Sequence, residues 1–548
     1  MTDKCLGLIC SALAFALTCA DCAAAAKFIG YGWDLAEAAP ESLVATASAL
    51  GCTGLDGVMV CVPKTRQADG SVISSASLPQ DAPWRYESLA GCEAKFRKFL
   101  VSTSLRESFL ETSWHFTPGR IALEDDAGWT RFSGNMRMLA RLARRSGFRG
   151  IVVDAEDYTK VRQFHTVAGD PEYGKASEIA RRRGREVFKG VFEEFPDVTV
   201  LSFWLFTRCA GACASQDPAS WVRQEGDLWP HFLNGVLDVM PAMATLVDGD
   251  EAAYKYDSRA DFDRGALRQV QKAAALVDPL NLEKFRARTR IGFGQYVDMY
   301  VNEPGKSGSW FFGPAGGSRL EHFRRNLEFA ADVGDYVWIY GEKRSWADWK
   351  DPKGYRRIRG YSRHNTWEQA LPGFAEVISE LRDPQGAARR TADRMRRGGA
   401  NNLYAANVHR RWAAPKESLP AFAVSGDEKS CIEVSGIAAG ALHVPVDGAK
   451  EGDIYVVDMW QKGEPGGVAE VIWRTGGPFN WKLGRHAITA GEADERGRRR
   501  AVRILHVPEG ADGLMFRINV RQNGGERAVF EDVAIYKSGR LGVSSAEF

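Results

Sequence analysis

Residues 131–158, RFSGNMRMLARLARRSGFRGIVVDAEDY, decide the fold because they hold one complete helix–turn–strand unit. Apolar side chains recur there at spacings of three and four, which predicts an amphipathic helix over Trp129–Arg145. They are Phe132, Met136, Leu139 and Ala143. The run Gly150–Asp154 is short, apolar and β-branched, as in a strand buried on both faces. The unit therefore predicts a parallel sheet with helices outside it.

The same alternation repeats from Lys27 to about Arg382. The predicted strands are Phe28–Trp33, Gly57–Val62, Ser108–Phe116, Gly150–Asp154, Val198–Phe206, Val236–Met240, Ile291–Met299 and Tyr336–Tyr340. Further helices are predicted over Ala176–Phe195, Phe262–Val277 and Leu320–Ala331. Eight strand–helix units in roughly 350 residues predict an α/β fold of the (β/α)₈ TIM-barrel type over residues 27–384. A doubly wound sheet would have fewer strands and a glycine-rich first turn, which is missing here.

The sequence changes character after the predicted barrel. Residues 385–418 are rich in arginine and are bounded by glycine and proline, which predicts a linker or a helix lying on the barrel. Its basic cluster could bind an anionic polymer, but a solvated helix face is the commoner explanation. In residues 419–548, short strands alternate with turn residues, which predicts an antiparallel β-sandwich that binds carbohydrate or supports the barrel. Trp460, Trp473 and Trp481 could form a sugar platform there or pack in its core.

Composition excludes several classes of protein. The chain has 548 residues, 45% hydrophobic and 26% charged, so it must bury a large core. A formal net charge of +2 excludes a whole-chain nucleic-acid binder, and we expect no nucleic-acid partner. Residues 1–26 resemble a signal peptide, so we expect a secreted or periplasmic protein. Apolar runs are too short for a membrane span.

Six cysteines follow the predicted signal peptide, and their even number permits disulfides in an oxidising compartment. Cys209 and Cys213 form the best local pair, because small residues separate them and let the chain curl back. Connectivity does not follow from the sequence. A metal site would need further ligands at a recognisable spacing, and none is present.

In a barrel of this type, the residues that follow the carboxyl ends of the strands line the active-site mouth. Here these positions are rich in carboxylates and in aromatic rings, which suit the flat apolar faces of sugars. The expected substrate-binding residues are Trp33, Asp34, His115, Trp204, Asp248, Tyr254, Gln295, Tyr340 and Trp346.

Paired carboxylates are what glycosidic cleavage needs, one as a proton donor and one as a nucleophile, base or electrostatic partner. Asp154 and Glu156 lie on one side of their strand, so an ionised Asp154 would raise the proton affinity of Glu156. We therefore expect Glu156 to be the acid. Glu342 is the first choice for the second carboxylate and Glu251 is the reserve.

The segment Gly150–Tyr158 resembles the strand-four signature of the chitinase family, which ends in Asp-x-Glu. That resemblance implies that Glu156 is the general acid and Asp154 its partner. Arg149 and Val152 stand where the family has acidic residues. A wider similarity, to exported glycoside-hydrolase-like barrels of polysaccharide-degrading bacteria, is carried by YGWD at 31–34, LVDGDE at 246–251 and YVWIYGEK at 336–343.

These observations predict an exported glycoside hydrolase that acts on a polysaccharide or a glycoprotein glycan without a cofactor. One alternative is a glycan-binding barrel that has lost turnover. The other is a metal-dependent hydrolase or lyase, with His115, Asp34 and Glu342 as conceivable ligands. No His-x-His or His-Glu-x-x-His spacing supports that last alternative. The oligomeric state does not follow from the sequence.

Overall fold

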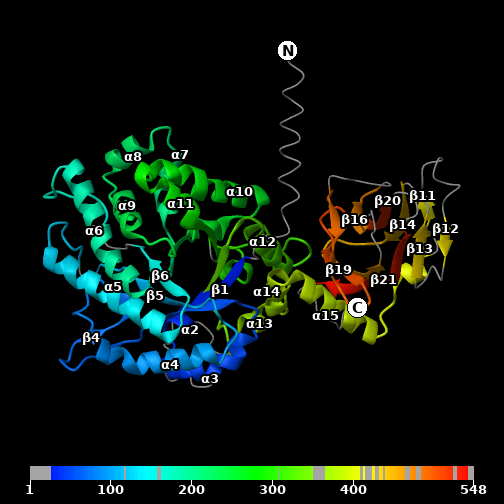
Figure 1. Cartoon of the computed structure of the whole chain (residues 1–548), viewed down its shortest axis with the longest axis horizontal. Coiled ribbons are helices and arrows are strands. Elements are labelled where there is room, and N and C mark those ends of the chain that lie inside the picture. The colour runs from blue at the N-terminus through cyan, green and yellow to red at the C-terminus, as the bar shows by residue number, and fades with distance from the viewer. Residues whose placement is uncertain are drawn as a thin grey trace, which may run out of the picture. The chain divides into compact units, whose positions relative to one another are not determined.

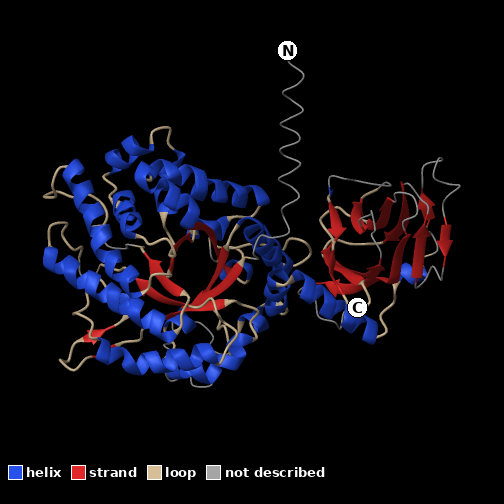
Figure 2. Cartoon of the chain, viewed as in Figure 1, coloured by secondary structure: helices blue, strands red, loops and turns tan. Residues whose placement is uncertain are grey.

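A computed structural model describes most of the chain after residue 25. The described residues are 26–116, 119–156, 162–306, 308–349, 365–407, 411–413, 423–425, 431–435, 439–462, 469–476, 483–521 and 527–540. Eight strands close into a barrel in the order β1-β10-β9-β8-β7-β6-β5-β2. They are β1 (Lys27–Gly32), β2 (Gly57–Cys61), β5 (Phe109–Ser113), β6 (Gly150–Asp154), β7 (Thr199–Ser202), β8 (Thr245–Asp248), β9 (Thr289–Tyr296) and β10 (Tyr336–Gly341). Figure 2 shows these strands ringed by helices, so the predicted barrel is confirmed.

Seven of the predicted barrel strands coincide with observed ones, but the strand predicted at Val236–Met240 is wrong. Those residues end helix α9 (Trp229–Val239), and the strand is β8, a few residues further on. The apolar residues of α9 recur with a helical period from Trp229 through Phe232 and Leu233 to Val236, and all are buried. The short window from Val236 onward lacks that period, which is why it resembles a strand.

Helices of different lengths cover the barrel (Figure 1). They include α3 (Pro40–Gly51), α4 (Ala90–Val101), α5 (Asp126–Ser146), α6 (Tyr173–Glu194), α8 (Pro218–Glu225), α10 (Arg259–Leu267), α11 (Leu282–Arg288) and α12 (Arg319–Val333). Helix α5 begins where the Asp125 side chain accepts the Gly128 N–H, and it ends at Gly147, whose φ is +92°. The helix predicted at Phe262–Val277 is broken, because α10 gives way to one π turn (Arg268–Lys272) and one 3-10 turn (Ala273–Leu276).

The C-terminal part is a sandwich of two antiparallel sheets, as predicted. One sheet has the order β11-β14-β20-β16-β17 and the other β12-β13-β21-β15-β19-β18. The strands are β11 (Arg411–Ala413), β12 (Ala423–Ser425), β13 (Cys431–Ser435), β14 (Ala439–Asp447), β15 (Asp453–Lys462), β16 (Ala469–Arg474), β17 (Arg485–Ile488), β18 (Ala490–Ala493), β19 (Arg498–His506), β20 (Gly513–Arg521) and β21 (Arg527–Arg540). Side chains of both sheets share one core, which includes Val457, Phe516 and Ile535.

Two of the sandwich tryptophans have defined environments. Trp473 is buried in the core, so of the two roles predicted for it, sugar platform or core packing, the structure shows core packing. Trp460 is half-buried, with the Arg498 guanidinium carbon 4.5 Å from its ring centroid. Trp481 lies outside the described residues.

The basic segment begins in helix α15 (Pro384–Arg397), which follows α14 (Phe374–Arg382). Ala388 and Ala392 on this helix pack against Val456 and Val502 of the sandwich. Several of its arginines form ion pairs: Arg390 with Asp383, Arg394 with Glu376 and Arg396 with Asp458. Three arginines of the cluster are therefore paired with acidic residues of the same chain.

Cys209 and Cys213, the best local pair for a disulfide, do not form one. All six cysteines after the predicted signal peptide are free thiols among the described residues. The Cys209 sulfur lies 3.5 Å from a carboxylate oxygen of Asp227, and the Cys213 sulfur lies 3.9 Å from the carbonyl oxygen of Phe206. Residues 1–25 of the predicted leader lie outside the described part of the chain. In the part that is described, no helix is long and apolar enough to cross a membrane.

Candidate active site

The register of the barrel strands aligns the candidate residues of β5, β6, β7 and β8 at one rim. Ser113 is paired with Asp154, Val153 with Ser202, and Ser202 with Asp248. The segments that continue from these aligned ends carry His115, Glu156, Trp204 and Glu251. Parallel strands deliver their carboxyl ends to the same rim, so four separate stretches of sequence meet there.

Asp154, the last residue of β6, organises the loop that follows it. One carboxylate oxygen accepts the backbone N–H of Glu156 at 3.0 Å. The other lies 3.9 Å from Nε2 of His115. Burial raises the pKa of Asp154 to about 6, although the Glu156 N–H and the nearby Arg208 charge oppose that shift.

Glu156 and Glu251 are electrostatically coupled, and both pKa values are raised. Burial and the charge of Asp154 raise the pKa of Glu156 to about 6. Burial, followed by the charges of Glu156 and Asp154, raises the pKa of Glu251 to about 9. At neutral pH, therefore, Glu251 holds a proton while Glu156 is mostly ionised. The predicted influence of Asp154 on Glu156 is present, but the carboxyl that holds its proton most strongly is Glu251, the residue predicted only as a reserve.

Trp204 and Tyr254 complete this cluster. A side-chain hydrogen bond to Trp204 lowers the pKa of both glutamates, and one to Tyr254 lowers that of Glu251. The Oε2 atom of Glu251 is buried and has no hydrogen-bond partner among the described residues. The structure thus brings together six predicted residues: Asp154, Glu156, Glu251, His115, Trp204 and Tyr254.

Two other predicted substrate-binding residues are buried, and their polar groups hold neighbouring loops. Asp248 is 1% exposed and accepts hydrogen bonds from the backbone N–H groups of Leu205 and Thr207, at 3.2 and 2.9 Å. It thereby fixes the loop that carries Trp204. Gln295 is also 1% exposed and donates to the carbonyl oxygen of Ala253 at 3.2 Å, within the short helix η5 (Glu251–Lys255) that carries both Glu251 and Tyr254.

Asp34 and Trp346 are held together by a hydrogen bond. Asp34 is buried and accepts the backbone N–H of Trp346 at 2.7 Å and the indole N–H of Trp349 at 3.0 Å. Burial raises the pKa of Asp34 to about 6. The Trp346 ring is buried and packs against Phe374, 5.8 Å between centroids. Of the predicted residues in this region, Trp33 remains exposed, at 39%.

Glu342 and Tyr340 belong to a second cluster, which follows β9 and β10. The Tyr340 and Tyr296 hydroxyls donate to the two oxygens of the Glu342 carboxylate, at 2.7 and 3.1 Å. The buried carboxylate of Asp298 accepts the backbone N–H groups of Glu342 and Lys343, at 2.7 and 3.0 Å. Glu342 is therefore tightly oriented by its neighbours.

The sequence analysis missed a buried acid beneath the rim. Glu111 on β5 is 1% exposed and accepts hydrogen bonds from the Cys61 thiol at 2.5 Å and the Ser113 hydroxyl at 2.8 Å. Burial and the nearby charge of Asp154 raise its pKa to about 7. The signal was the charged Glu111 directly after the apolar pair Phe109–Leu110 of β5, where strand alternation points it into the barrel.

Arg208 is the second residue that was missed. It donates to the carbonyl oxygen of Ala155 at 2.9 Å and lies over the Trp229 ring, 5.2 Å from its centroid. Its charge opposes the rise in pKa at both Asp154 and Glu156. Arg208 is therefore one of the positive charges that favour the ionised forms of Asp154 and Glu156.

Asp250 occupies the N-cap position of η5, but its side chain makes no cap hydrogen bond, and its ion pair with Arg268 is buried. It is fully buried with φ of +36°, a left-handed conformation that non-glycine residues seldom adopt. The Tyr256 hydroxyl donates to it at 3.0 Å, and Arg268 lies 3.9 Å away. This turn sets the direction of the next residue, Glu251. Asp157 and Tyr158 lie outside the described residues.

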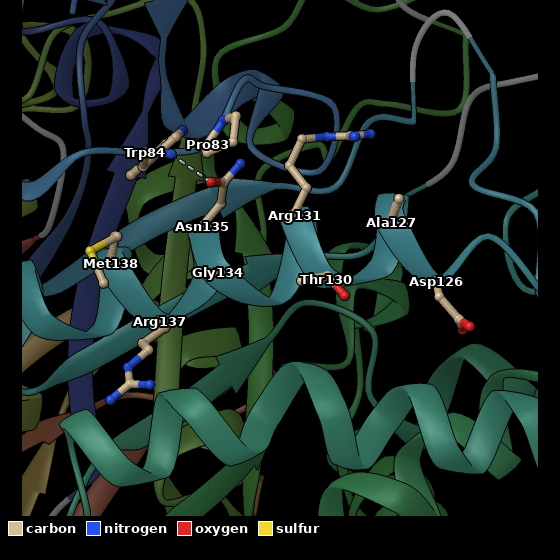
Figure 3. Close-up of a pocket in the computed structure, with 10 residues that line it drawn as sticks. All are labelled: Pro83, Trp84, Asp126, Ala127, Thr130, Arg131, Gly134, Asn135, Arg137 and Met138. Carbon is tan, nitrogen blue, oxygen red and sulfur yellow. Dashed lines mark hydrogen bonds between the residues drawn. The ribbon is translucent and has the colours of Figure 1, made fainter.

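A pocket of about 700 Å³ lies elsewhere on the barrel wall, along α5 (Figure 3). Its lining includes Trp84, Arg131, Asn135 and Met138, and the backbone N–H of Trp84 donates to Asn135 at 2.8 Å. None of the rim carboxyls lines it. Among the described residues, no three His, Cys, Asp or Glu side chains are grouped in a way that could hold a metal ion.

Comparison with known proteins finds no matching family model and no match among functionally curated proteins. Among solved structures, a glycoside hydrolase family 5 protein of Bacteroides vulgatus is 11% identical, with a TM-score of 0.30, over 90% of this chain and 89% of its own. A structure titled "CBM4 structure and function" is 15% identical, with a TM-score of 0.18, over 25% of this chain and 90% of its own. The enzymatically active domain of bacteriophage CBA120 tailspike protein 4 is 12% identical, with a TM-score of 0.20, over 37% of this chain and 30% of its own. The fold assignment rests on the strand pairing, and the chemistry of the site rests on its own residues.

Proposed function

We propose that this protein is an exported glycoside hydrolase that cleaves a polysaccharide or a glycoprotein glycan, with Glu251 as the proton donor. The observation that carries the proposal is the pair of neighbouring rim carboxyls that share Trp204 as a hydrogen-bond partner; burial raises the pKa of both, and more strongly that of Glu251, whose buried Oε2 has no hydrogen-bond partner among the described residues. Acid–base cleavage of a glycosidic bond needs one carboxyl that holds its proton and one that is ionised.

The bonds and protons balance without a cofactor. Glu251 gives its proton to the glycosidic oxygen as the bond from that oxygen to the sugar carbon breaks. The Glu156 carboxylate stabilises the positive charge that develops on the sugar ring, and the carbon gains a hydroxyl from water. The proton released by that water restores Glu251. Trp204, held beside both carboxyls, offers an aromatic face to the sugar.

This assignment differs from the one predicted from sequence. There Glu156 was the proton donor and Glu251 the reserve for the second carboxylate; here Glu251 is the donor and Glu156 the ionised partner. Asp154 remains the charge that raises the pKa of Glu156, but it also raises that of Glu251. Glu342 is a weaker candidate for the second carboxylate, because both of its oxygens already accept tyrosine hydroxyls.

The test compares wild-type protein with Glu251→Gln and Glu156→Gln on a panel of polysaccharides and released glycoprotein glycans, with new reducing ends as the readout. Each glutamine variant should lose activity by about 10² to 10⁴. The loss in Glu251→Gln should shrink on aryl glycosides whose leaving group needs no proton. Glu178→Gln, at an exposed position on α6, is the matched control. Full activity of Glu251→Gln on substrates with poor leaving groups would refute the assignment.

A further inference from the structure

The charge of the pocket along α5 comes from one arginine. Three of the residues that line the pocket are charged: Asp126, Arg131 and Arg137. Asp126 accepts a hydrogen bond from Arg183 at 2.5 Å, and Arg137 donates one to Glu194 at 2.8 Å, so both are paired with residues of α6. Arg131 has no ion pair, hydrogen bond or ring contact within the described part of the chain. Among the described residues, its positive charge is therefore not balanced by a partner.

The Arg131 side chain is half-buried, and it lies on the side of α5 that faces Pro83 and Trp84. The side chains of Asp126 and Arg137 point away from that side (Figure 3). A cation that loses part of its water without gaining a partner destabilises the fold. A bound anion would supply the partner. A carboxylate suits the position best, because its two oxygens match the fork of the guanidinium.

Gly134 leaves the floor of the pocket open. It lies one turn after Arg131 on α5, and Met138 follows one turn later, so the three residues share one face of the helix. Glycine in the middle of a helix is less stable than alanine. A Cβ added at Gly134 would meet no atom within 4 Å apart from the backbone of its own helix, so packing does not require glycine here. A side chain at this position would instead fill space that a ligand can use.

The opposite wall of the pocket is held in place by side chains. Asn135, fully buried, accepts the backbone N–H of Trp84 at 2.8 Å. The Trp84 indole N–H donates to the Asp81 carboxylate at 2.9 Å. The next backbone N–H, that of Arg85, donates to the side-chain oxygen of Gln67 at 2.8 Å. The wall is therefore preformed, and these two backbone N–H groups are already taken.

We propose that this pocket binds an acidic sugar, a uronate unit of a polysaccharide, with the sugar carboxylate on the Arg131 guanidinium. The C–H groups of the sugar ring occupy the open space at Gly134 and pack against Met138 and Pro83. The volume of about 700 Å³ is in the range of small-ligand sites. An acidic peptide suits the pocket less well, because a peptide binds largely through backbone hydrogen bonds and the N–H groups of the wall are taken.

The choice of a sugar rests on the proposed glycan-directed function, but the site is a second one. None of the rim carboxyls lines the pocket, so a sugar bound there is held and not cleaved. The pocket would keep an acidic polymer on the protein while the rim acts on another part of the chain.

Binding is measured by titration calorimetry in the Glu251→Gln background, so that no probe is consumed. The probes are polygalacturonate, alginate and hyaluronan, each as the carboxylate and as its methyl ester, which keeps the sugar backbone but removes the charge. We expect at least one acidic polymer to bind, and to bind more weakly as salt is added. Arg131→Gln should raise its dissociation constant about tenfold or more, the size of effect that loss of a charged hydrogen-bonded pair has. Methyl esterification should weaken binding to the parent by a similar factor.

Gly134→Leu tests the open floor separately from the charge. It should raise the dissociation constant about tenfold or more, because the leucine occupies the ligand space. Its Tm should equal or exceed that of the parent, because leucine favours a helix and a side chain has room there. Arg106→Gln, at an exposed position outside the pocket lining, is the matched control for loss of one arginine.

The proposal is overturned if no acidic polymer binds, or if Arg131→Gln or Gly134→Leu binds within twofold of the parent. It is also overturned if Arg106→Gln loses as much affinity as Arg131→Gln, or if polyglutamate binds as tightly as the best sugar polymer. Its failure is separable from that of the hydrolase proposal. Product formation with binding that ignores Arg131 refutes the pocket alone, whereas Arg131-dependent binding without product from wild-type protein refutes hydrolysis alone.

Discussion

Glu251→Gln should make the protein more stable at neutral and alkaline pH while it removes activity. In wild-type protein the folded state holds the pKa of Glu251 at about 9, against an ordinary value of 4.5. Below about pH 4.5 this carboxyl is protonated in both the folded and unfolded chains, and it has no effect on stability. As the pH rises from there to about 9, the unfolded chain loses the proton first, so the free energy of unfolding falls.

The fall amounts to about 1.4 kcal/mol per pH unit, or about 3 kcal/mol at pH 7. Glutamine does not titrate, so the free energy of unfolding of the variant does not fall in this way as the pH rises. Its amide oxygen can still accept hydrogen bonds from Trp204 and Tyr254. Any constant cost of burying the amide N–H₂ is the same at every pH. The difference in unfolding free energy between Glu251→Gln and wild type is therefore the sharp readout, and it should grow steadily between pH 5 and 8.

The assay is urea unfolding of both proteins at half-unit steps of pH, followed by barrel tryptophan fluorescence. Glu156→Gln provides an internal comparison, because the pKa of Glu156 is raised only to about 6 and its stability difference should stop growing above that pH. Glu178→Gln controls for the exchange of a carboxyl for an amide at an exposed position. Parallel stability profiles for Glu251→Gln and wild type would refute the conclusion that Glu251 is protonated in the folded protein.

Three further predictions follow from the same features. First, the pH profile of kcat/KM should be bell-shaped, falling below about pH 6 as Glu156 gains a proton and above about pH 9 as Glu251 loses one; a profile on a good substrate that stays flat from pH 5 to 10 would contradict this. Second, Asp248→Asn should destabilise the protein by about 2 kcal/mol and lower kcat, because an amide N–H₂ faces backbone donors and the Trp204 loop loses its anchor; calorimetry and kinetics check both effects, and unchanged stability would remove the anchor role. Third, the exported protein should begin near Lys27, and N-terminal sequencing that finds Met1 on exported protein would rule out the signal peptide.

The fold could be predicted from sequence wherever a strand is buried on both faces. Strand β6 matches its predicted bounds, because an apolar β-branched run with a charged end fits no other element as well. The sequence analysis placed strand β8 too early because the end of α9 is equally apolar. A window of five residues is too short to distinguish the helical period from the strand period.

The site could be predicted only in part. Position at a strand end nominated Glu156 and Glu251, which lie together at the rim, but it also nominated Asp248 and Gln295, which turn inward and hold loops. A polar residue at a strand end binds substrate or anchors a neighbouring loop, and the sequence pattern is the same for both. The order of the pKa values of Glu156 and Glu251 depends on burial and on charges from different strands, which become neighbours only when the barrel closes.

The most direct test of the central claim is hydrolysis in water enriched in ¹⁸O, with products from the polysaccharide and glycan panel read by mass spectrometry. A glycoside hydrolase that works through Glu251 and Glu156 should release fragments that carry one ¹⁸O at the newly formed reducing end, and Glu251→Gln should release far fewer. Unsaturated fragments without ¹⁸O would show elimination by a lyase instead. The absence of any product across the panel would contradict the claim that this barrel turns over a glycan.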